Sequence, residues 1–77
     1  LGHFLNEKCQ LDPNYEEKSG NLYQNYREYC QSIGEYIRST SDFYTALKNA
    51  GFQRQHKQNG RFIKGLRLKV EADEFLS

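Results

Sequence analysis

The 77-residue sequence predicts a small α+β domain in which three helices precede a C-terminal β-hairpin. Three stretches repeat apolar side chains at helical spacing, and after Gly51 the apolar period changes from about 3.6 residues to about 2. The dipeptide Asn59-Gly60 in this later part is typical of a hairpin turn. A chain of this length forms one domain, and we expect its six Tyr and five Phe to supply most of the core.

The first helix is expected at residues 2–11, followed by a polar loop. Four apolar residues recur there at helical spacing: Leu1, Phe4, Leu5 and Cys9. Pro13 ends this pattern, because proline does not continue a helix. The residues after it are polar and turn-forming, and a short extended piece is expected near residues 17–19.

The second helix is expected at residues 22–33. Its apolar stripe consists of Leu22, Tyr26, Tyr29, Cys30 and Ile33. Asn21 or Ser19 can cap the start of this helix, and Gly34 suits the left-handed residue that closes it.

The third helix is expected between Ser39 and Gly51, with Asp42 in the position of a capping-box acid. Its buried stripe consists of Phe43, Ala46, Leu47 and Ala50. Its exposed face then contains Ser41, Tyr44, Thr45, Lys48 and Asn49. Solvated helix faces are normally rich in charged residues of both signs, so this face predicts contacts with a ligand. An ordinary exposed face is the alternative, and for Tyr44 so is half-buried packing.

The last part of the chain predicts a two-stranded hairpin. Phe62, Leu66 and Leu68 share one parity and are expected to face the core. A two-residue Asn59-Gly60 loop would turn Phe52 away from that face, whereas a three-residue loop that includes Gln58 returns it to the core. We therefore expect a loop of three or more residues.

Charge is distributed unevenly along the sequence. Residues 43–70 contain seven Lys or Arg and no Asp or Glu, whereas the remainder contains four cations and ten acids. The net charge of +1 therefore combines a segment of +7 with a remainder of −6. The seven cations are Lys48, Arg54, Lys57, Arg61, Lys64, Arg67 and Lys69. Protection of a sheet edge explains about two or three of them, and the rest predict an anionic partner such as nucleic acid.

The order of helix, loop, helix, short extended piece, helix and hairpin is that of a winged helix-turn-helix domain. We expect this domain to span residues 1–69, with residues 70–77 as a C-terminal tail. The third helix is then expected in or near the major groove of DNA, and the hairpin forms the wing. The wing residues expected to contact backbone phosphates are Arg54, Lys57, Asn59, Arg61 and Lys64.

Four strings of the sequence resemble a known family in their order and spacing. They are FLNEKC, LYQNYREYCQSIG, STSDFYTALKNAGF and GRFIKGLRL, and they cover most of residues 1–69. They are similar to the C-terminal domain of poxvirus-type and phage or plasmid primase-helicases. Tyr29 stands where that family usually has Trp. The matching positions are core and turn residues, so the resemblance transfers no base-reading role to this sequence.

The resemblance implies a winged-helix module that follows a superfamily-three helicase ATPase, often with a primase domain further upstream. It implies a role in DNA replication in the cytoplasm of a bacterial host, with a phage or prophage as the source. The partner is then DNA, as a duplex or a fork, or RNA. An intramolecular contact with the parent helicase domain is also implied, and we expect the fragment itself to be monomeric.

The sequence predicts no catalytic, cofactor or metal site in this fragment, and hence no enzyme activity of its own. It contains no HExxH motif, no Gly-Lys-Ser/Thr phosphate loop and no Ser/His/Asp set. Cys9 and Cys30, with only His3 and His56 as further ligands, make a poor zinc set. We expect both cysteines to be reduced, buried thiols, with a disulfide as the alternative.

The sequence contains no apolar run of about 18 residues and no signal-peptide pattern. It starts at Leu1 and contains no Met, which predicts a fragment of a longer protein. Two other functions stay open at this point. One is a protein-docking module of the same replication protein, and the other is a small sequence-specific transcription regulator.

Overall fold

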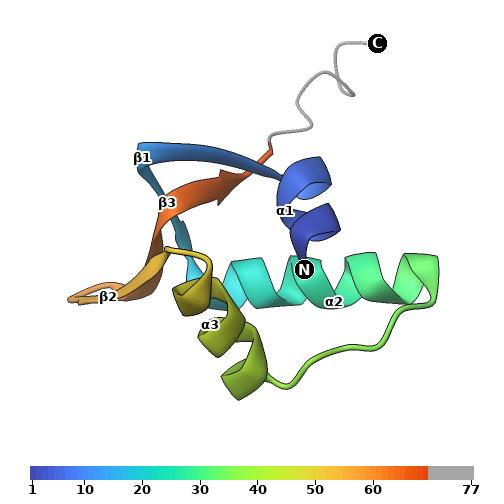
Figure 1. Cartoon of the computed structure of the whole chain (residues 1–77). Helices are drawn as coiled ribbons and strands as arrows, with labels where there is room; N and C mark the ends of the chain where they lie inside the picture. The colour runs from blue at the N-terminus through green and yellow to red at the C-terminus, as the bar shows by residue number, and fades with distance from the viewer. Residues whose placement is uncertain (70–77) are drawn as a thin grey trace, which may run out of the picture.

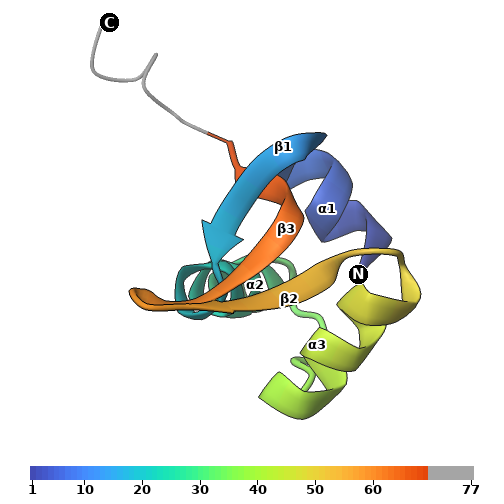
Figure 2. The ribbon, with the colours of Figure 1, turned by 90° about the vertical axis from the view of Figure 1, so that its left-hand side faces the viewer.

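The computed structural model describes residues 1–69, in which three helices pack with a three-stranded antiparallel sheet (Figure 1). In chain order the elements are α1 (Gly2–Lys8), β1 (Cys9–Lys18), α2 (Ser19–Ile33), α3 (Thr40–Asn49), β2 (Gln53–Lys57) and β3 (Gly60–Leu68). The strand order is β1-β3-β2, so β3 is central and the other two strands are edges (Figure 2). The predicted α+β class with three helices and a C-terminal hairpin is confirmed. The predicted tail at residues 70–77 lies outside the described residues.

The prediction for residues 9–16 is wrong, because these residues belong to the ten-residue strand β1 and not to a helix end and a loop. The extended piece expected near residues 17–19 is confirmed at residues 17–18, which end this strand. Helix α1 ends at Lys8, and Cys9 has an extended backbone with φ −127° and ψ 150°. β1 pairs with β3 near both of its ends, with a shift of register between them. Pro13 lies in this irregular stretch, where no ladder hydrogen bond requires its missing N–H. Residues 35–39, between α2 and α3, form no strand.

The core joins all three helices to β3 and to the start of β1. It is formed by Phe4, Cys9, Leu22, Tyr26, Cys30, Phe43, Leu47, Ile63 and Leu66. The ring of Phe43 on α3 stacks on that of Tyr26 on α2 with 4.5 Å between centroids, which fixes the two helices against each other. Both cysteines are free and buried, as predicted, and burial raises the pKa of the Cys9 thiol to about 12.

The ends of α2 and α3 follow local sequence signals. Ser39 caps α3 as predicted, and its hydroxyl accepts a hydrogen bond from the backbone N–H of Asp42 at 3.2 Å. Gly34 closes α2 as predicted, with a left-handed φ of 71°. The predicted start of α2 is wrong, because the helix begins at Ser19, so that Ser19 and Asn21 lie inside it and neither caps it.

The β2–β3 turn is shorter than the predicted loop of three or more residues. Lys57 pairs with Gly60, which leaves a two-residue loop of Gln58 and Asn59. The turn therefore lies one residue earlier than the Asn59-Gly60 pair that the sequence indicates.

β3 changes face at Gly65, whose φ is 101°. Its buried residues are Ile63 and Leu66, which a regular strand would place on opposite faces. Phe62, predicted to face the core, lies on the side of the sheet opposite Ile63. Gly65 also leaves room for Phe52, because a Cβ at this position would lie 3.0 Å from the Phe52 ring. The predicted loop length is wrong because β3 does not alternate regularly through this glycine.

Candidate nucleic-acid interface

A hollow of about 490 Å³ lies between the exposed face of α3 and the start of β2. The residues that line it are Ser41, Tyr44, Thr45, Lys48, Gln53 and Arg54. All of them except Gln53 are predicted contact residues. Helix α3 presents its share of them because Phe43 and Leu47 are buried on another side of the helix. Two of the lining residues are cations, and none is a carboxylate.

Asn49, predicted to belong to the same group, lies on a different side of α3. It lines a second hollow of about 540 Å³ together with Leu5 of α1 and Asp42. Thr45 lines both hollows and marks the boundary between them. The structure therefore does not bring Asn49 together with Arg54.

Tyr44 supports Arg54 and does not offer a free ring. Its hydroxyl donates a hydrogen bond to the Ser19 carbonyl at 2.9 Å, and its ring lies 5.3 Å from that of Phe43. The guanidinium carbon of Arg54 lies 4.6 Å from the centre of the Tyr44 ring, which is a cation–π distance. Tyr44 is thus half-buried and packed, and it holds the charge of Arg54 beside the hollow.

Ser19, the first residue of α2, connects α3 to β3 and has no role in the sequence prediction beyond that of a cap. Only 7% of Ser19 is exposed, and its hydroxyl donates a hydrogen bond to the Arg61 carbonyl at 3.2 Å. Its own carbonyl accepts the hydrogen bond from Tyr44. The sequence does contain a signal for this burial, because Ser19, Leu22 and Tyr26 lie on one helical stripe.

The β2–β3 hairpin has two faces with different charge environments. Arg54 pairs with Ile63, and His56 pairs with Arg61, so these four residues share the face that contacts the helices. We call Arg54, His56 and Arg61 the inner face of the hairpin. Together with Gln55 they line a shallow hollow of about 260 Å³.

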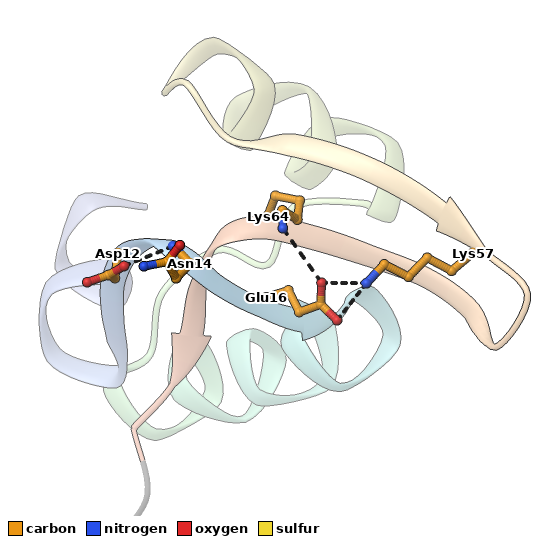
Figure 3. Close-up of polar contacts among 5 residues, drawn as sticks. All are labelled: Asp12, Asn14, Glu16, Lys57 and Lys64. Carbon is orange, nitrogen blue, oxygen red and sulfur yellow. Dashed lines mark hydrogen bonds and ion pairs between the residues drawn. The ribbon is translucent and has the colours of Figure 1, made fainter.

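The opposite side, which we call the outer face, contains Lys57, Phe62 and Lys64. Glu16 of β1 lies against it, and the Lys57 Nζ donates to both oxygens of the Glu16 carboxylate, at 2.7 and 2.9 Å (Figure 3). The Lys64 Nζ lies 3.9 Å from the same carboxylate. The hydrogen bond from Lys57 is the main cause that holds the pKa of the Glu16 carboxyl below its usual range.

Two of the predicted phosphate contacts, Lys57 and Lys64, therefore have an acidic partner that the local sequence does not reveal. Glu16 and Lys57 are 41 positions apart, so a count of charges along the basic segment misses the pair. The pairing of β1 with β3 brings Glu16 opposite Lys64. No spacing in the sequence indicates this contact.

The other cations of the basic segment differ in their surroundings. The guanidinium carbon of Arg67 lies 3.9 Å from the centre of the Tyr15 ring, and its Nε donates to Gln10 at 2.9 Å. Asn59 is exposed in the hairpin turn. Among residues 1–69, three cations near α3 and the inner face form no ion pair with an acid: Lys48, Arg54 and Arg61.

No protein-family model matches the sequence, and a search of curated proteins finds no similar one. Over residues 1–69, no helix is long and apolar enough to cross a membrane. The same residues contain no group of three or more His, Cys, Asp or Glu that could hold a metal ion. The charge, hydrogen-bond donors and shape of the surface between α3 and β2 are therefore the features that bear on function.

Proposed function

We propose that this domain is a winged-helix module that binds nucleic acid through α3 and the inner face of the β2–β3 hairpin. The order of elements supports this proposal, because the hairpin follows α3 directly and the sheet order is β1-β3-β2. In a winged helix-turn-helix domain, the helix in the position of α3 enters the major groove, and the hairpin lies beside it as the wing.

The single observation that carries the proposal is the acid-free hollow between α3 and β2. Phosphate oxygens accept hydrogen bonds, and this hollow is lined by donors: the hydroxyls of Ser41 and Thr45 and two cationic side chains. Arg61 extends the positive charge along the inner face. Because Arg54 rests on Tyr44, its donors are held in place before a phosphate binds.

The proposed phosphate contacts are fewer than the basic segment alone indicates. The two outer-face lysines share the Glu16 carboxylate, so we assign the contacts to Lys48, Arg54 and Arg61. Each phosphate neutralised on duplex DNA contributes about −0.9 to the slope of log affinity against log salt. Three contacts therefore predict a slope of about −2.7.

Titration of the protein into a labelled DNA duplex at about 50 and about 200 mM salt tests this assignment. A variant with Arg54→Gln and Arg61→Gln removes two inner-face cations, and the matched variant with Lys57→Gln and Lys64→Gln removes two outer-face cations. We expect the first variant to lose about tenfold or more in affinity, and the second to change by less than about threefold. No binding at about 50 mM salt, or equal losses in the two variants, contradicts the proposal.

The resemblance to primase-helicases supports placing this module at the C-terminus of a phage-type replicative protein. In that setting the module would hold DNA in the cytoplasm of a bacterial host. The ATPase and primase chemistry would belong to other domains of the parent protein.

Protein docking is a second candidate function, favoured by two exposed apolar side chains. Ile33 at the end of α2 is 49% exposed, and Tyr36 in the loop that follows is 81% exposed. Side chains of this kind often anchor contacts between proteins, and the parent helicase domain is the proposed partner. Replacing both with Ser should abolish capture by that domain and leave DNA affinity unchanged. Unchanged capture contradicts docking through this loop.

A further inference from the structure

We propose that β2 binds a second class of ligand, an extended acidic peptide that adds to the three-stranded sheet as a further strand. This inference goes beyond the proposed function, because the ligand is a protein segment and its main contacts are hydrogen bonds to the β2 backbone. It rests on the place of β2 in the sheet, on the hollows beside this strand and on the charges around them.

The edge of β2 that faces away from β3, which we call the free edge, has unpaired backbone groups. Among residues 1–69, β2 pairs with no strand other than β3. Lys57 and Gly60 close a two-residue loop, so they form a hydrogen-bonded pair, and such pairs alternate along an antiparallel ladder. Arg54 and His56 therefore direct their N–H and C=O groups away from β3. Donors and acceptors in such a row are the groups to which an added strand binds.

The opposite edge of the sheet, along β1, is less suited to an added strand. The pairing of β1 with β3 shifts register between Leu11 and Glu16, and Pro13 in this stretch has no N–H to donate. Irregularities of this kind protect an edge from further pairing. β2 contains no proline and pairs with β3 without a register shift, so its edge is the regular one.

Two hollows leave room for a strand beside β2. Gln53 and Arg54 line the hollow of about 490 Å³. Arg54, Gln55 and His56 line the hollow of about 260 Å³. Consecutive residues of a strand point to opposite faces, so hollows lined by consecutive residues extend along the edge of β2. Residues of α3 line the other side of the larger hollow, and α3 lies on the side of β2 away from β3 (Figure 2).

The charges around the free edge favour an acidic strand. Three cations line the two hollows, namely Lys48, Arg54 and Arg61, and no carboxylate lines either of them. Cations on an edge repel an identical strand, but they attract one that carries Asp or Glu. In antiparallel pairing, the residues opposite Arg54 and His56 face the same way as these two residues, toward the inner face. The preferred ligand therefore has acids at alternate positions.

A peptide of about seven residues that alternates Thr with Glu is the probe for this site. Its affinity is measured by fluorescence anisotropy, and a matched peptide that alternates Thr with Gln is the control for charge. We expect the Glu peptide to bind at least about tenfold more tightly at about 50 mM salt. Equal binding of the two peptides, or binding of neither, overturns the inference.

Two N-methylated forms of the Glu peptide separate strand addition from attraction between charges alone. One form carries its methyl groups on the Glu residues and the other on the Thr residues, so their charge is the same. Only alternate N–H groups of a strand point to its neighbour, and in antiparallel pairing these belong to the Glu residues. The first form should therefore lose about tenfold or more in affinity, and the second less than about threefold. Equal losses, or a larger loss from methylated Thr, overturn antiparallel strand addition.

His56→Pro and His56→Ala test the same contact from the side of the protein. Both variants remove the imidazole, but only Pro removes the N–H that points to the free edge. Proline is tolerated at this place, because that N–H takes no part in the ladder with β3. Peptide affinity should be about fivefold or more lower in His56→Pro than in His56→Ala. Equal affinities overturn the inference where circular dichroism shows both variants folded, and the N-methylated peptides decide where His56→Pro does not fold.

Competition with a DNA duplex distinguishes this inference from the proposed function. The peptide and the duplex both use Lys48, Arg54 and Arg61, so peptide at about ten times its Kd should weaken duplex binding about tenfold. Simultaneous binding without loss places the peptide elsewhere and overturns the inference. If the duplex does not bind at all, the proposed function fails, and the peptide titrations alone decide the inference.

A second copy of the chain is the other occupant to be tested. Sedimentation velocity should find monomers in the absence of peptide, because Arg54 and Lys57 on two β2 edges repel each other. Dimers that dissociate in His56→Pro would show that a second copy covers the free edge, and would overturn the peptide as its ligand.

Discussion

The two faces of the β2–β3 hairpin carry the same sign of charge in different surroundings. On the outer face, Lys57 and Lys64 lie around one carboxylate. On the inner face, Arg54 and Arg61 line hollows that contain no carboxylate. All four cations come from one segment of sequence without an acid. Strand pairing, and not the local count of charges, therefore decides which cations remain available to an anionic ligand.

The left-handed backbone of Gly65 changes the face of β3, so replacement of this glycine is the largest expected disturbance of this arrangement. Gly65→Ala puts a side chain at φ 101°, with its Cβ 3.0 Å from the Phe52 ring. The left-handed backbone costs about 1–2 kcal/mol and the forced contact about 1–3 kcal/mol more. The free energy of unfolding, measured by urea denaturation, should therefore fall by about 2–5 kcal/mol.

Gly51→Ala is the matched control for this substitution. Gly51 has a φ of 102°, but a Cβ at this position would meet no atom within 4 Å. The free energy of unfolding should therefore fall only by the cost of the left-handed backbone, about 1–2 kcal/mol. Equal losses in the two variants would show that the Phe52 ring moves aside without cost.

Removal of the outer-face carboxylate should leave the cations on both faces of the hairpin without an acidic partner. In Glu16→Gln, Lys57 and Lys64 lose their ion pairs and become free to bind phosphates. Affinity for duplex DNA at low salt should rise about three- to tenfold, and the salt slope should steepen by up to about 1.8. Glu28→Gln on α2 makes the same change in net charge and should leave the slope unchanged. Identical slopes in the two variants would show that the outer face takes no part in binding.

The same ion pairs predict that the stability of the protein depends on pH, and this effect is the smallest of those expected here. The pKa of Glu16 lies below its ordinary value of 4.5, chiefly because Lys57 donates a hydrogen bond to it. A lowered pKa contributes stability that is present above the unfolded value and lost as the pH falls through the folded value. Thermal unfolding followed to below pH 4.5 should therefore show a loss that is smaller in Glu16→Gln than in the unmodified protein. If both proteins lose stability in parallel as the pH falls, this ion pair does not contribute to stability in acid.

Features that depend on near neighbours in the chain could be predicted from the sequence. Ser39 caps α3, and Gly34 closes α2, because both effects act within about one helical turn. The burial of Phe43 and Leu47 likewise sets the exposed face of α3. The side chains that share this face could therefore be predicted from the sequence, except that Asn49 lies on a different side of α3.

Features that depend on distant pairing could not be predicted in this way. β1 has no regular apolar alternation and is held by its pairing with β3. The turn could not be placed from strand parity, because the left-handed backbone of Gly65 interrupts the alternation. The contact between Glu16 and Lys57 forms across the sheet, over 41 positions of sequence.

The two hydrogen bonds of Ser19 also bear on when the proposed interface can form. They join the start of α2 to Tyr44 and Arg61, which lie 25 and 42 positions further along the chain. Contacts of such separation close large loops and form later than local helices. During synthesis, Tyr44 and the hairpin therefore reach their final positions only after β3 has emerged from the ribosome. A nascent chain does not form the proposed interface until β3 is complete.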